Sequence, residues 1–245
     1  TVDQRFGSIS PAEPDTLQHH FNQQAFTEGL SGHYNTTGNL GSPRMSRLFA
    51  EQISSMFEHR FIFQTPYDFF ITQPNALLYT NTKSPFVNLT YHSCGNKQNG
   101  EDRIRGLYYV KEKKKLGVGF KLDYLYGRGY YTSQSTAHFN ATFYGSYRSE
   151  RYDMHTQYYA NHLKNSENGG IEEDTYITQP EAYPTKYGTA DMPTQLTKTW
   201  NKLNVNTFFL THRYKLGYYQ GRDQQNNVVK KTRTNGKNKL LQSAI

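Results

Sequence analysis

From about residue 67 onward, apolar and polar side chains alternate with a period of two, as in β-strands whose two faces meet different surroundings. The clearest example is the segment 116–126. Every second residue, from Leu116 to Tyr126, is apolar or aromatic, and the residues between them are two glycines, a lysine, an aspartate and a leucine. The same period predicts strands at 67–73, 86–94, 104–111, 116–127, 136–147, 152–162 and 201–219.

The connections between the predicted strands alternate in length. Long polar connections follow 86–94, 116–127 and 152–162, whereas the connections with the sequences EKKK and RSER are short. In an up-and-down meander, successive connections lie at opposite ends of the sheet. Outer-membrane barrels keep short turns at the periplasmic end and long loops at the extracellular end. The pattern therefore predicts 163–200 as an extracellular loop and 111–115 and 148–151 as periplasmic turns.

The predicted fold is all-β, with an antiparallel up-and-down meander that forms part of a transmembrane β-barrel. The strands are expected within 67–245, which would form an incomplete barrel. Residues 1–66 lack the alternation and are predicted to be an extended segment. Within this segment, Pro43 and the helical spacing of apolar residues predict a short amphipathic helix near 43–57, which could pack on a sheet or plug a lumen.

Composition leaves two classes of β protein open. Of the 245 residues, 35% are hydrophobic and 15% are aromatic, and the mean hydropathy is -0.87. So many aromatic residues argue against disorder, and the scarcity of aliphatic residues fits either a barrel with a polar interior or a sugar-binding β-sandwich. No apolar run reaches the roughly 18 residues of a membrane helix. The polarity of the faces alone does not separate the two classes. The alternation of long and short connections favours the barrel.

Neither the distribution of charge nor the reactive residues indicate a nucleic-acid, metal or catalytic site. The net charge is +8, but the basic runs Lys111–Lys115 and Lys230–Arg233 lie where turns are expected, so no nucleic-acid partner is predicted. His19 and His20 lack further ligands at metal-binding spacing. The acidic run Glu172–Asp174 fits a solvated loop. With Cys94 as the single cysteine and no catalytic constellation, we expect no disulfide, metal, cofactor or enzyme activity.

Strict alternation assigns individual residues to the two faces. The residues expected to face lipid are Val87, Leu89, Leu116, Val118, Phe120, Leu122, Phe139 and Phe143. The residues expected to line the lumen are Arg105, Lys121, Asp123, Asn140, Asp153, His155 and Gln157. Because a charged group is costly in hydrocarbon, the second set should meet water or a partner.

Several segments resemble the N-terminal part of the putative porins of Bacteroidales outer membranes. They are LGSPRMSRLF at 40–49, FITQPNALLYTNTKSPFVNLTYHSCGNKQNGEDRIRGLYY at 70–109, GFKLDYLYGRGYY at 119–131 and NHLKNSENGGIEED at 161–174. The resemblance implies a longer β-barrel in the outer membrane of a Gram-negative bacterium, with this chain as its first part.

The leading hypothesis is a channel for passive diffusion of small hydrophilic solutes through a polar lumen. Its expected partners are outer-membrane lipid and those solutes, and its oligomeric state stays open. The alternatives are a surface β-sheet module that binds glycans through tyrosines, a plugged barrel with a docking role, and, more remotely, a barrel-type enzyme.

Overall fold

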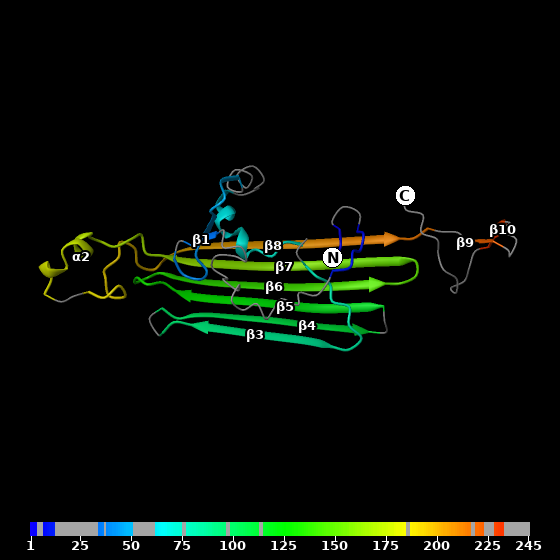
Figure 1. The fold of residues 1–245 in the computed structure, drawn as a ribbon, viewed down its shortest axis with the longest axis horizontal. Coiled ribbons are helices and arrows are strands. Elements are labelled where there is room, and N and C mark those ends of the chain that lie inside the picture. Colours follow the sequence, from blue (N-terminus) through cyan, green and yellow to red (C-terminus); the bar gives the residue numbers. More distant parts are fainter. Residues whose placement is uncertain are drawn as a thin grey trace.

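The computed structural model describes residues 1–3, 7–12, 34–36, 38–50, 62–74, 77–96, 99–112, 115–184, 187–216, 219–222 and 228–232. Its centre is one antiparallel sheet of six strands. They are β3 (Phe86–Cys94), β4 (Glu101–Glu112), β5 (Leu116–Arg128), β6 (Ser135–Arg148), β7 (Tyr152–Glu167) and β8 (Thr199–Tyr214). From β4 onward, each strand pairs with the strand that precedes it in the chain, so the sheet is the predicted meander. Figure 1 shows the six strands side by side in one layer.

The lengths of the connections alternate as predicted. The short connections, 113–115 and 149–151, lie at one end of the sheet, and the longer ones, 95–100, 129–134 and 168–198, lie at the other. The longest connection carries α2 (Thr175–Thr178) and η5 (Pro180–Ala182) and extends beyond that end in Figure 1. We call the two ends of the sheet the short-turn end and the long-loop end.

The N-terminal part does not belong to the main sheet. It contains a two-stranded pair, β1 (Tyr34–Thr36) with β2 (Arg44–Ser46), and the 3₁₀ helix η3 (Ile62–Phe70). Among the described residues, no helix is long and apolar enough to cross a membrane.

The strand predicted at 67–73 is wrong, because η3 occupies most of this segment. Pro66 has no backbone N–H to donate to a strand ladder, and Gln64 Nε2 donates to Asp68 Oδ1 over 2.9 Å, one helical turn along. Tyr67, Phe70 and Ile71, spaced three and four residues apart as in a helix, pack together against the sheet. The main sheet therefore begins at Phe86 rather than at residue 67.

The helix predicted near 43–57 is wrong over its first residues. Arg44–Ser46 form β2, and helical structure begins only at Phe49. Contacts with other segments override the helical pattern here, because β2 pairs with β1 and the Arg44 guanidinium lies over the Phe69 ring, 4.3 Å from its centre. Residues 51–57 of the predicted helix lie outside the described residues.

The last predicted strand, 201–219, is divided. β8 ends at Tyr214, and β9 (Tyr219–Arg222) pairs with β10 (Val228–Thr232) as a separate hairpin. In Figure 1 this hairpin lies beyond the short-turn end.

Candidate functional site: two faces of the sheet

One face of the sheet, called here the outer face, carries the residues that were expected to meet lipid. All eight of them, from Val87 of β3 to Phe143 of β6, point to this side. Many side chains on it are exposed although they are apolar: Val87 and Leu89 keep 66% and 73% of their surface accessible. One row across four strands consists of Phe120, Phe143, Tyr158 and Phe208. Exposed apolar patches of this extent are typical of surfaces that contact a membrane or another protein.

The opposite face, called the inner face, carries the residues that were expected to line the lumen. Arg105 lies on β4, Lys121 and Asp123 on β5, Asn140 on β6, and Asp153, His155 and Gln157 on β7. Each of them is buried or half-buried.

Several charged groups on the inner face have partners on other strands or on neighbouring loops. Arg103 and Asp123 form a bidentate pair, with Nε 2.9 Å from Oδ1 and Nη2 2.6 Å from Oδ2. Lys215 Nζ lies 2.7 Å from Asp153 Oδ2. Near the β3 edge, Arg105 Nη2 is 3.4 Å from His92 Nε2. The inner face is therefore a structured polar surface with charges of both signs.

Gly119 illustrates why a position on the inner face of β5 requires a residue without a side chain. Its register partners are Tyr109 of β4 and Tyr144 of β6. The two tyrosine rings stack, with centroids 6.2 Å apart and an interplanar angle of 9°. A Cβ atom at Gly119 would overlap the Tyr144 ring, so the glycine makes room for the rings.

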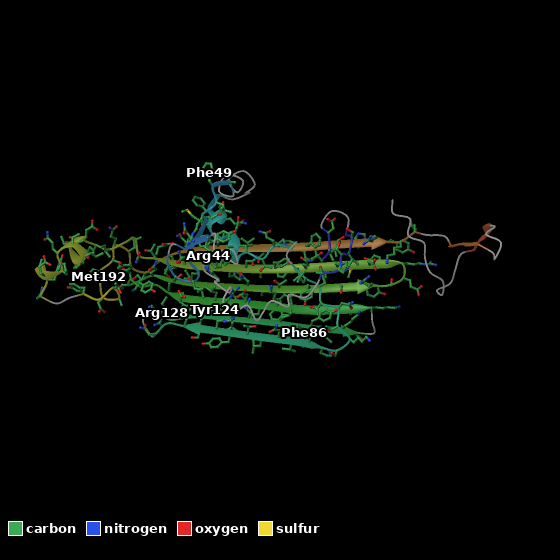
Figure 2. All side chains as sticks on the ribbon, in the orientation of Figure 1. Arg44, Phe49, Phe86, Tyr124, Arg128 and Met192 are labelled. Carbon is green, nitrogen blue, oxygen red and sulfur yellow. The ribbon has the colours of Figure 1, made fainter. Side chains whose placement is uncertain are left out.

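The N-terminal segment covers the inner face and is held there by hydrogen bonds. Asn39 Nδ2 donates to the Gly127 carbonyl over 3.1 Å, and Thr136 Oγ1 donates to Asn39 Oδ1 over 3.0 Å. Further along, Asn140 Nδ2 donates to the Phe70 carbonyl over 2.9 Å. We call these covering segments, described in parts between residues 1 and 82, the N-terminal layer; Arg44 is labelled in it in Figure 2.

Two apolar clusters anchor the N-terminal layer to the inner face. The first combines Phe70 and Ile71 with Leu125 of β5 and Leu163 of β7. The second combines Leu77 with three buried tyrosines of the sheet, Tyr109, Tyr144 and Tyr159. The adjacent Tyr79 meets His155 edge to face, with ring centroids 5.0 Å apart, and burial raises the pKa of Tyr79 to about 12.

Arg103 is a charged residue of this face that the sequence prediction missed. The predicted strand began at residue 104, so Arg103 fell one position before it, although extending the alternation back from Arg105 would have found it. His138 is a second omission: its Nε2 lies 2.7 Å from the Gly41 carbonyl. A partner so distant in sequence gives no local signal.

The described residues contain no cluster of three or more His, Cys, Asp or Glu side chains that could hold a metal ion. His19 and His20, for which the sequence predicted no metal site, lie outside the described residues.

Comparison with known proteins agrees with the architecture. No curated protein and no solved structure matches the chain. The profile of the protein family described as "Putative porin" matches residues 1–241, which is nearly the whole chain. The chain therefore belongs to the putative porin family.

Proposed function

We propose that this chain forms part of an outer-membrane channel through which small hydrophilic solutes diffuse passively, without catalysis. The observation that carries the proposal is the exposed apolar outer face, backed by a polar inner face. Along β5 the apolar positions run from Leu116 to Tyr126, which are ten steps of about 3.4 Å apart, or about 34 Å. At a strand tilt of about 40°, this corresponds to a band about 26 Å tall, close to the roughly 25 Å of outer-membrane barrels.

Polar atoms on the inner face support a hydrated interior. Arg105 Nε, Asn140 Oδ1 and Asp153 Oδ1 are buried and have no hydrogen-bond partner among the described residues. Buried polar atoms are usually satisfied by protein groups or by ordered water. Water in contact with this face would satisfy all three.

The proposed pathway follows a charged patch on β4 and β5. Arg103, Arg105 and Lys121 lie there with two carboxylates, Asp123 and Glu101. Three cations against two anions should favour anionic solutes only weakly, because strong filters use rings of one sign.

The N-terminal layer favours a second candidate, a plugged barrel that does not conduct and serves for docking. The layer is fixed to the inner face by both apolar clusters and by several hydrogen bonds. In the channel proposal the same layer narrows the lumen, whereas in the second candidate it closes it. The glycan-binding module would leave the exposed outer face in water, which its apolar surface disfavours.

Planar-bilayer recording tests the proposal. We expect conductance with weak anion preference, and Lys121→Glu should shift the reversal potential toward cations. Leu77→Ser, which weakens the second apolar cluster, should raise conductance if the N-terminal layer narrows the lumen. Lys83→Gln, outside the inner face, is the control and should change neither quantity. Absence of conductance in protein that runs as a folded, heat-modifiable band would overturn the channel and leave the plugged barrel.

A further inference from the structure

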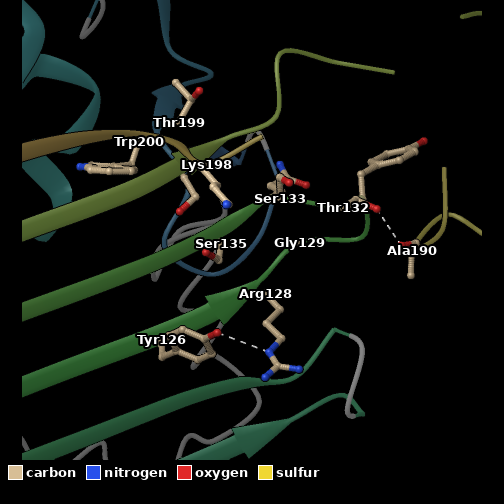
Figure 3. Close-up of a pocket in the computed structure, with 13 residues that line it drawn as sticks. Tyr126, Arg128, Gly129, Thr132, Ser133, Ser135, Ala190, Lys198, Thr199 and Trp200 are labelled. Carbon is tan, nitrogen blue, oxygen red and sulfur yellow. Dashed lines mark hydrogen bonds between the residues drawn. The ribbon is translucent and has the colours of Figure 1, made fainter. Parts of the chain in front are cut away.

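A cavity of about 550 Å³ lies at the long-loop end of the sheet, where the predicted extracellular connections meet. Outer-face side chains at the ends of four strands contribute to it: Tyr126 and Arg128 of β5, Ser135 of β6, Ser166 of β7 and Trp200 of β8. Loop residues complete the wall, and Thr132 Oγ1 ties the β5–β6 loop to the Ala190 carbonyl over 2.7 Å. Figure 3 shows Arg128 and Lys198 among the side chains around the cavity.

The cavity lining is cationic and rich in hydroxyl groups. Arg128 and Lys198 supply two positive charges, and none of the lining residues is aspartate or glutamate. A guanidinium group suits phosphate oxygens because it can donate two parallel hydrogen bonds. Serine and threonine hydroxyls can donate to and accept from sugar hydroxyls. The flat ring of Trp200 offers an apolar surface with a polar edge.

The backbone of the cavity is strained at two positions. Ser133 and Lys198 have φ angles of 60° and 59°, and they are the non-glycine residues with positive φ in the described part of the chain. Both line this cavity. Residues held in such sparsely populated conformations gather at ligand sites, where the strain positions a side chain.

More cations lie beside the cavity, on the outer face itself. Lys164 and Lys202 face each other in register on β7 and β8, one row closer to the apolar band than Trp200. Lys164 Nζ lies 5.1 Å from the centre of the Trp200 ring. Like charges placed opposite each other destabilise a sheet, and the described residues show no ion pair for either lysine. A shared anionic ligand would relieve this repulsion.

We propose that this cavity binds the phosphorylated sugar headgroup of an outer-leaflet glycolipid. Arg128 and Lys198 would hold the phosphate, Trp200 would pack on the sugar ring, and Lys164 with Lys202 would face a second anionic group. The lipid source follows from position: the lining side chains of the strands lie on the outer face, just beyond the apolar band. The identification of the ligand as a lipid rests on the proposed outer-membrane location, whereas the recognition of a phosphosugar does not.

Trp200 is the chain's only tryptophan, so its fluorescence reports on this cavity directly. Folded protein in detergent micelles is titrated with lipid A, with lipid A whose phosphates have been removed, and with soluble glucosamine 1-phosphate. We expect a saturable fluorescence change with lipid A. The double variant Arg128→Gln/Lys198→Gln should weaken it by at least about tenfold, the loss expected for one charge-assisted hydrogen bond. Lys83→Gln, at the short-turn end, is the control and should bind as the unchanged protein does.

Each other outcome argues against a specific part of the proposal. Equal binding of the dephosphorylated lipid, or an unaffected double variant, would overturn phosphate recognition. Glucosamine 1-phosphate binding as tightly as lipid A would replace the lipid with a soluble phosphosugar. No fluorescence change would overturn the site altogether. Insertion into lipid vesicles, measured separately by heat-modifiable gel mobility, reports on the proposed outer-membrane location and not on the cavity.

Discussion

A lysine at Phe143 distinguishes a lipid neighbour of the outer face from water. Phe143 pairs in register with Phe120 of β5. Phe120 lies four residues from Leu116 and six from Tyr126, so both side chains are near the middle of the apolar band. Its side chain is 53% exposed, so a lysine there meets little protein. Near the midplane of a bilayer the charge should cost about 2–4 kcal/mol, whereas on a surface in water the change should stay within about 0.5 kcal/mol.

The charge must be separated from the loss of the ring, because Phe143 packs on Phe120 with ring centroids 4.7 Å apart. We therefore compare Phe143→Lys with Phe143→Ala by urea unfolding in phospholipid vesicles. The same pair of substitutions at Tyr147, on the same face but toward the short-turn end, is the depth control and should differ by only about 0–1 kcal/mol. A difference below about 0.5 kcal/mol at Phe143 would show that the outer face does not meet hydrocarbon.

Three further predictions concern topology, packing and pH. An epitope inserted at Gly169–Gly170 should bind antibody on intact cells and one at Glu150 should not; the reverse labelling would invert the topology. Gly119→Ala should lower the free energy of unfolding by about 1–3 kcal/mol, because its Cβ overlaps a tyrosine ring. Gly106→Ala, whose Cβ would meet only ordinary contacts at 3.9 Å, should stay within about 0.5 kcal/mol in the same urea titration. Since burial raises the pKa of Tyr79 to about 12 from about 10 in an unfolded chain, stability should fall as pH rises through that interval. The fall in stability is measured as a loss of protease resistance of the N-terminal layer with rising pH. This loss should be smaller in Tyr79→Phe.

The strands of the sheet were predictable because each has two faces in different surroundings. Alternation over 116–126 sets the orientation of every residue in β5 and, through the register, of its neighbours. The error at 67–73 has a related cause. A short apolar run fits the period of two of a strand. It fits equally well the three- and four-residue spacing of a helix, as in Tyr67, Phe70 and Ile71. Only the contact of these side chains with the sheet decides between strand and helix.

The N-terminal layer could not be predicted from local patterns, because its partners are remote in sequence. Asn39 and Thr136 are 97 residues apart, and Asn140 lies 70 residues from the Phe70 carbonyl that it binds. Leu125 carried a signal of this layer within β5. It is a leucine among the small and charged residues of the inner face, and an apolar side chain on a wetted wall would be exposed without a partner. Its burial beneath Phe70 and Ile71 accounts for this exception.

In the proposed channel, the leucines and tyrosines of the inner face would limit where a solute pathway can run. The apolar clusters dock the N-terminal layer over β4 to β7, through Tyr109, Leu125, Tyr144 and Leu163. The charged patch on β4 and β5 lies between the two clusters, toward the β3 edge, where Arg103 and Asp123 pair in a half-buried position. Solutes would therefore pass between that patch and the N-terminal layer rather than along the middle of the inner face. Conductance should then respond more strongly to Lys121→Glu than to removal of the charge at Asp153, which Lys215 neutralises near the short-turn end.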